Sequence, residues 1–297
     1  MLLSDLLLKY AASRIKFSGR SEGEYRTTIA NLSRWMGREA LLSDLTDETL
    51  AGFLRSRVRE RSAPTARKDR QQLLSLWRWA WRKSITETQP RDIPDVPVPR
   101  KRVRAWHPSE VATILQACAM TPAWNGWTAN EWVALVLVCY DSGERIGALL
   151  RCPLSGFNAA SKTLLIPANV RKCGAADQLA SLHTDTVAAI ERTIREPREL
   201  LFEFPGCYLT LLRRFKAILV AAGIDVSGRK VWHDLRKSSF TLTWAALGKE
   251  AARQQCGHSQ DLSAFYLDAA LLAEFSPQQR VADVIARPAA VAERLVG

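Results

Sequence analysis

Two arginines, two histidines and a tyrosine in this chain could together attack a phosphodiester without a metal. Four of them lie close to the C-terminus, at His233, Arg236, His258 and Tyr266, whereas Arg145 lies far upstream. Arginine suits the charge that grows on the non-bridging oxygens, because its planar fork forms bidentate bonds and stays charged. Arg145 and Arg236 could therefore clamp the two non-bridging oxygens of one phosphate.

The histidines could move protons and the tyrosine could attack. His233 lies three residues before Arg236, so both project from one face of a helix. An imidazole can bond a phosphate oxygen or move a proton near neutral pH. Tyr266 is the expected nucleophile, because nearby cations and a proton acceptor can activate a phenol. Each residue alone also has a structural interpretation, as a salt-bridged arginine, a helix-capping histidine or a packed ring, so only the spaced set favours chemistry.

A lysine in the middle of the chain could supply the general acid that expels the 5′ oxygen. Two strands, at 162–166 and 178–182, are predicted to flank a glycine-containing turn with Arg171 and Lys172 at its tip. A lysine on a flexible hairpin tip is suited to protonating a leaving oxygen. Lys172 is therefore the first candidate, and Lys162, at the other end of the first strand, is the weaker alternative.

The order of these residues resembles the tyrosine recombinase (phage integrase) family, which cuts and rejoins DNA, over most of the chain. The matching set is Arg145, Lys172, His233, Arg236, His258 and Tyr266. The resemblance implies that these six residues are catalytic and that Tyr266 forms a 3′-phosphotyrosyl link while a 5′-hydroxyl is released. That link keeps the bond energy, so the resemblance implies a reaction without ATP, a metal or another cofactor.

The sequence departs from the family's pattern at three places. An acidic residue usually stands three positions after the first arginine, but this chain has Ala148 there. That carboxylate would orient its neighbours, so the site must be supported differently or react more slowly. The step from His258 to Tyr266 is one position shorter than in common members, and Ser142 replaces a frequent threonine. None of these changes removes a catalytic group, so we expect an active enzyme.

The composition fits a nucleic-acid-binding protein of ordinary globular type. The chain has 297 residues, 47% of them hydrophobic, and a formal net charge of +12. A protein with such an excess of positive charge usually binds a polyanion, most commonly a nucleic acid. The six cysteines are scattered singly without a CxxC pair, which argues against a zinc site and a disulfide framework. With no signal peptide or membrane-spanning stretch evident, a cytoplasmic, nucleoid-associated protein is expected.

The pattern along the chain predicts two mainly α-helical domains. Residues 1–86 carry helical periodicity and are expected to form a helical domain, which the resemblance implies is a core-binding (SAM-like) domain. Residues 87–106 hold four prolines and a basic run and are expected to be a linker. Residues 107–297 are expected to form the catalytic domain, mainly α with a small β-sheet, opening on a helix with Pro108 in its first turn and Glu110 two positions later. The two domains are expected to clamp duplex DNA.

Basic residues of the first domain and the linker are the expected DNA contacts. They are Arg67, Lys68, Arg70, Lys101, Arg102 and Arg104. By resemblance the partner is double-stranded DNA with inverted half-sites, bound by a dimer on each site and a tetramer in the synapse. An apolar stripe from Leu271 to Ile285 predicts a C-terminal helix, expected to dock on a neighbouring protomer. The alternative is that this helix folds back onto its own domain.

Several functions share these features. Within the class, an integrase, a chromosome-dimer resolvase, an invertase and a transposon recombinase are equally compatible with the sequence. A type IB topoisomerase shares the chemistry, although a separate helical domain favours a recombinase. From other classes, a catalytically silent DNA-binding regulator of the same fold and a basic helical scaffold remain as alternatives. The complete set of six catalytic candidates argues against both.

Overall fold

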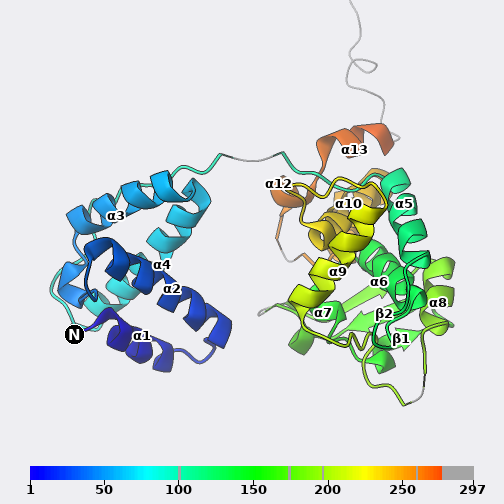
Figure 1. Ribbon diagram of the computed structural model, residues 1–297, viewed down its shortest axis with the longest axis horizontal. Helices are drawn as coiled ribbons and strands as arrows, with labels where there is room; N and C mark the ends of the chain where they lie inside the picture. Colours follow the sequence, from blue (N-terminus) through cyan, green and yellow to red (C-terminus); the bar gives the residue numbers. More distant parts are fainter. Residues whose placement is uncertain (100–101, 173–174, 196, 259, 276–297) are drawn as a thin grey trace, which may run out of the picture. The chain divides into compact units, whose positions relative to one another are not determined.

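The computed structural model describes residues 1–99, 102–172, 175–195, 197–258 and 260–275 of the chain. The chain forms two compact units, Met1–Lys101 and Arg102–Gly297, each with its own apolar core (Figure 1). No helix in the described part is long and apolar enough to cross a membrane. The predicted C-terminal helix lies mostly outside the described residues, which contain only its first part.

The first unit consists of helices. They are α1 (Leu3–Ala12), α2 (Gly19–Met36), α3 (Asp47–Glu60) and α4 (Ala63–Arg82), with a short 3₁₀ turn at Leu42–Asp44. Local sequence sets their starts, because Thr46 and Ser62 accept hydrogen bonds from the backbone N–H groups three residues on. The periodic apolar residues face a common core, as predicted. Trp35, Val58 and Trp81, which extend these stripes, are each 42% exposed, because they lie at the margin of the buried face.

The proline-rich segment predicted as a linker over 87–106 is partly packed. Ile93 packs against the apolar core of the first unit and Val96 is part of it, while Asp47 accepts hydrogen bonds from the backbone N–H groups of Arg91 and Asp92. Prolines prevent a helix there but leave such packing possible. At the other end, buried Trp106 belongs to the core of the second unit. The predicted linker is therefore too long on both sides.

The second unit surrounds a small sheet with helices. The helices are α5 (Pro108–Ala119), α6 (Ala129–Ser142), α7 (Ile146–Leu149), α8 (Thr184–Glu191), α9 (Tyr208–Ala221), α10 (Val231–Leu247), α11 (Lys249–Gln255), α12 (Ser263–Tyr266) and α13 (Ala269–Phe275). The strands β1 (Phe157–Asn158), β2 (Thr163–Ile166) and β3 (Gln178–Ser181) pair antiparallel in the order β1-β2-β3. Both predicted strands are confirmed. The two-residue β1 is too short to leave a periodic signal in the sequence.

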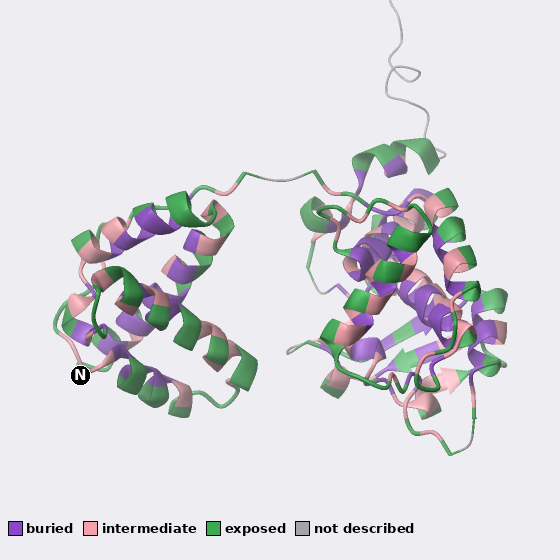
Figure 2. Cartoon of the chain, in the orientation of Figure 1, coloured by how far each residue is buried: buried purple, intermediate pink, exposed green. Residues whose placement is uncertain are grey.

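Helices α6 and α10 form the framework of this unit. Helix α6 packs against α5, α8 and α10 (Figure 1). Most of α10 is buried, including the polar residues Asp234, Arg236 and Ser238 (Figure 2). Aromatic stacking joins α9 to α10, because the ring centroids of Phe215 and Trp232 lie 3.9 Å apart. The burial of several polar side chains on one helix indicates a functional site rather than packing of the hydrophobic core alone.

Candidate active site

The segment after α6 carries the first arginine to the site. Helix α6 ends at Gly143, whose φ of +57° is the left-handed conformation that glycine adopts without strain. A Cβ atom at this position would lie 2.5 Å from the Cys256 sulfur, so the turn passes directly against the end of α11. Arg145 follows as the residue before α7, with its side chain 36% exposed.

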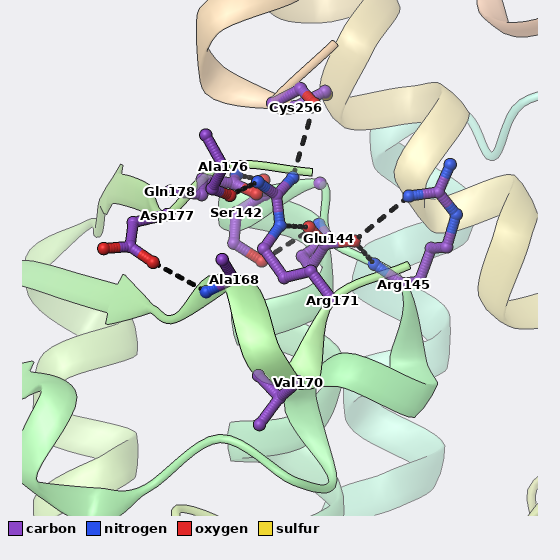
Figure 3. Close-up of polar contacts among 12 residues, drawn as sticks. Ser142, Glu144, Arg145, Ala168, Val170, Arg171, Ala176, Asp177, Gln178 and Cys256 are labelled. Carbon is purple, nitrogen blue, oxygen red and sulfur yellow. Dashed lines mark hydrogen bonds and ion pairs between the residues drawn. The ribbon is translucent and has the colours of Figure 1, made fainter. Parts of the chain in front are cut away.

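Glu144, between that glycine and arginine, is a buried carboxylate at the centre of the site. Its side chain is 1% exposed. One carboxylate oxygen lies 3.3 Å from Arg236 Nη1 and 3.6 Å from Arg145 Nη1, and the other accepts a 2.6 Å bond from Arg171 Nε. Figure 3 shows Glu144 between Arg145 and Arg171, joined to both. A single negative charge therefore holds three guanidinium groups from three parts of the chain.

The second arginine is fully enclosed. Arg236 is 1% exposed and donates hydrogen bonds to the carbonyl oxygens of Gly143 and Cys256. Its Nη2 also lies 2.6 Å from His258 Nε2. Because a guanidinium only donates, His258 Nε2 must accept there, which places the imidazole proton on Nδ1. Arg236 Nε and His258 Nδ1 are buried and have no hydrogen-bond partner among the described residues, as befits groups that bind a ligand.

Aromatic contacts bring the tyrosine to the same place. The Tyr266 ring lies 4.5 Å from the His258 ring and 5.1 Å from the His233 ring, centroid to centroid. Arg236 Cζ lies 5.2 Å from the centre of the Tyr266 ring. His233 and Arg236, three residues apart on α10, thus both reach Tyr266. The tyrosine itself is 6% exposed, on the short helix α12.

Both histidines have depressed pKa values in this structure. Burial, followed by the positive charges of Lys237 and Arg236, lowers the pKa of His233 to about 4. Burial, followed by Arg236 and Arg145, lowers the pKa of His258 to about 3. Both imidazoles are therefore neutral at pH 7. His233 can accept a proton or a hydrogen bond, whereas His258, whose Nε2 already accepts from Arg236, presents its Nδ1–H as a donor.

A cavity of about 320 Å³ opens beside these groups and is lined by positive charge. Its walls include Arg145, Arg171, Lys172, Arg253 and His258. One carboxylate, that of Asp177, also lines it. Lys172 is exposed, whereas Arg171, predicted at the tip of the turn beside it, is 6% exposed and points inward. The surplus of cations favours an anion in this cavity.

The predicted DNA-binding residues divide between the two units. Arg67 and Lys68 are exposed on α4, and Arg102 and Arg104 are exposed at the start of the second unit. Lys101 lies outside the described residues. Arg70 differs from the prediction, because its guanidinium donates hydrogen bonds to the carbonyl oxygens of Ile93 and Pro94. It fastens the proline-rich segment to α4.

The structure adds Glu144, Arg171 and Gln178 to the residues predicted for the site. Gln178 donates hydrogen bonds to the carbonyl oxygens of Ser142 and Gln255 and so joins β3 to both sides of the site. The sequence held one signal for Glu144, since a carboxylate directly beside an arginine in a buried segment must be paired. Across the described residues, no group of three or more His, Cys, Asp or Glu side chains is placed to hold a metal ion.

Comparison with known proteins shows what this architecture is. Neither the models of known protein families nor the curated proteins match the sequence. Solved structures do. A lambda integrase dimer bound to a COC′ core site matches with a TM-score of 0.68 and 19% identity, over 94% of this chain and 79% of that one. The Tn1549 transposon integrase in complex with transposon right end DNA matches with a TM-score of 0.70 and 13% identity, over 100% of both chains.

A third match extends the comparison. The XerH site-specific recombinase, in a post-cleavage complex with a palindromic difH substrate, has a TM-score of 0.67 and 15% identity, over 93% of this chain and 82% of that one. The chain therefore has the tyrosine recombinase fold, mainly helical with a small antiparallel sheet, as predicted from the order of its candidate residues.

Proposed function

We propose that this protein is a site-specific DNA recombinase that breaks and rejoins duplex DNA through a covalent link to Tyr266. The observation that carries the proposal is the convergence of Arg145, Arg236, His258 and Tyr266, from distant segments, on one buried site beside a cationic cavity. The fold supports the same interpretation, because solved structures with this fold include integrases and recombinases bound to DNA.

The proposed reaction begins with the scissile phosphate in the cavity. Arg145 and Arg236 bind its non-bridging oxygens and stabilise the charge that grows there. The Tyr266 hydroxyl oxygen attacks phosphorus while its proton passes to the neutral imidazole of His233. The bond from phosphorus to the 5′ oxygen breaks, and Lys172 protonates that oxygen. The products are a 3′-phosphotyrosyl link and a free 5′-hydroxyl, and attack by a 5′-hydroxyl from another strand reverses the step.

In this proposal the first unit, Met1–Lys101, is a core-binding domain, and both units bind DNA. Exposed Arg67 and Lys68 on α4 and Arg102 and Arg104 on the second unit supply phosphate contacts. The substrate is duplex DNA with inverted half-sites, bound by one dimer per site and a tetramer in the synapse. Solved structures of the same fold include a lambda integrase tetramer bound to a Holliday junction.

The test is trapping of the covalent intermediate. The protein is incubated with a nicked suicide substrate made from the DNA that flanks its own gene, and adducts are mapped by mass spectrometry. We expect wild type to form an adduct at Tyr266 and Tyr266→Phe to form none while its gel-shift affinity is unchanged. Tyr208→Phe is the matched control, because Tyr208 is 45% exposed at the start of α9 and outside the site.

Two results would contradict the proposal. An adduct that persists in Tyr266→Phe, or one that maps to Tyr208, would place the nucleophile elsewhere. Specific binding without any adduct from wild type would instead support the alternative from another class, a catalytically silent DNA-binding regulator of this fold.

A further inference from the structure

The buried ion pair between Glu144 and Arg171 joins two segments 27 residues apart. Both side chains are 1% exposed, and Arg171 Nε lies 2.6 Å from the Glu144 carboxylate. We propose that this pair positions the general acid Lys172 and the histidine His258 for the reaction, without touching the substrate itself. The inference rests on the proposed recombinase function and adds two positioning residues to it.

The guanidinium of Arg171 connects three parts of the site. Besides Glu144, it donates hydrogen bonds to the carbonyl oxygen of Ala176, across the hairpin, and to that of Gly257, at 3.3 Å. These bonds tie Arg171 to oxygen atoms of three separate segments, so this arginine acts as a clamp. Gly257 permits the close approach, because a Cβ atom there would lie 2.1 Å from Arg171 Nη2 and the φ of this residue is +60°.

The two groups that the clamp would position are its immediate neighbours in the chain. Lys172 follows Arg171 directly, and His258 follows Gly257 directly. Fixing the backbone at Arg171 and Gly257 therefore restricts where the lysine amine and the imidazole can go. Both residues line the cationic cavity. A displacement of about 1 Å in such groups is enough to slow a reaction by about 100-fold.

Glu144 is the carboxylate that this segment provides for the task. Ala148, three residues after Arg145, is 3% exposed and packs in the apolar core, so it offers no charge. Glu144 reaches Arg145 and Arg236 as well as Arg171, and it thereby ties the hairpin to both phosphate-binding arginines. Because a buried ion pair adds little net stability compared with apolar packing, its value here lies in fixed geometry.

A change of the leaving group distinguishes positioning of Lys172 from other effects. General acid catalysis contributes about 100-fold to 10,000-fold, and a 5′ sulfur leaves as a thiolate without needing a proton. Loss of a well-placed Lys172 should therefore slow cleavage of ordinary DNA while leaving cleavage of a 5′-bridging phosphorothiolate substrate nearly unchanged. Lys172→Ala gives the reference pattern.

The experiment measures single-turnover cleavage rates of full-length Arg171→Gln on both substrates. We expect at least a 100-fold loss on ordinary DNA and a much smaller loss on the sulfur substrate. The part of the loss that is due to Lys172 is recovered there, as in Lys172→Ala, whereas the part that is due to His258 remains. Glu144→Gln should lose activity on both substrates, because it also releases Arg236 and Arg145. Arg171→Lys keeps the charge and should recover part of the rate on ordinary DNA.

Two features keep the test decisive if some of the variant protein misfolds. Misfolding lowers the amplitude of adduct formation, whereas displacement of Lys172 lowers its rate constant. Arg198→Gln is the matched control, since Arg198 donates hydrogen bonds to the carbonyl oxygens of Thr193, Leu200 and Leu201 outside the site. Its rate constants should equal those of wild type.

The outcomes separate this inference from the function on which it rests. If wild type cleaves but Arg171→Gln is equally impaired on both substrates, or has the wild-type rate constant on ordinary DNA, the positioning role is overturned and the function stands. If wild type forms no adduct on either substrate, the proposed function is overturned, and the inference with it.

Discussion

Acidification from pH 7.5 to pH 5.0 should destabilise the second unit through its two site histidines. In the folded protein, the pKa of His233 is lowered to about 4 and that of His258 to about 3, mainly by burial. In the unfolded chain both should titrate near the ordinary value of 6.5. Below pH 6.5 the two histidines therefore bind protons in the unfolded chain but stay neutral in the folded protein. Stability is complete above that pH and falls as the pH approaches the folded pKa values.

The size of the effect follows from the two pKa values. At pH 5.0 each imidazole is about 1.5 pH units below its unfolded pKa and still neutral when folded, which corresponds to about 2 kcal/mol per histidine. The two together give about 4 kcal/mol, less a reduction for His233, which is only partly buried and better screened by solvent. Ordinary carboxylates titrate lower, near pH 4, so they contribute little in this interval.

Urea unfolding of the full chain at both pH values, followed by tryptophan fluorescence and circular dichroism, measures the loss. The first unit is an internal reference, because all four histidines lie after residue 101. A His233→Gln/His258→Gln double variant should lose most of the pH dependence. Equal stability of wild type at pH 5.0 and 7.5, or a fall that survives in the double variant, would refute the assignment of neutral, buried imidazoles.

Two further predictions test the DNA-binding residues and the clamp. Arg102→Gln/Arg104→Gln should flatten the slope of log K for DNA binding against log salt by about 0.9 for each DNA phosphate that the variant no longer neutralises. Arg70→Gln should leave this slope unchanged, because Arg70 binds backbone carbonyls. The opposite pattern would show that Arg70, and not Arg102 and Arg104, contacts DNA. Gly257→Ala should lower the free energy of unfolding by about 1–2 kcal/mol, because the backbone of residue 257 is left-handed. It should also slow cleavage of ordinary DNA, with recovery on the sulfur substrate, since the added Cβ would displace Arg171. Wild-type rates on both substrates would exclude a role of this contact in positioning Lys172.

The helices could be predicted because each depends on a local signal. Periodic apolar residues mark α2, α3 and α4, and Thr46 is of the residue type that caps the start of a helix such as α3. The start of α5 was also predictable, with Pro108 in its first turn and Glu110 closing a capping box. Short elements were not, because β1 and α12 span two and four residues and carry no period.

The sequence indicated a candidate site residue only where the type of that single side chain suits the proposed chemistry. Arg145, Arg236 and Tyr266 are groups whose types alone suit a phosphate, and their order along the chain indicated their grouping. The role of Arg171 could not be predicted in this way. In sequence it is one of two adjacent cations in a turn, and nothing local distinguishes the buried one from the exposed Lys172.

What separates those two cations is a long-range partner. Arg171 can be buried because Glu144, 27 residues earlier, is buried beside it, and a guanidinium would not be tolerated in the interior without a carboxylate partner. The same partner explains how the proposed site can do without an acid at Ala148, because Glu144 reaches Arg145 and Arg236, the two arginines proposed to bind phosphate. The absence of one expected carboxylate from a sequence motif is therefore weak evidence that the site is inactive. The structure must first show which carboxylates pair with the buried arginines of the site.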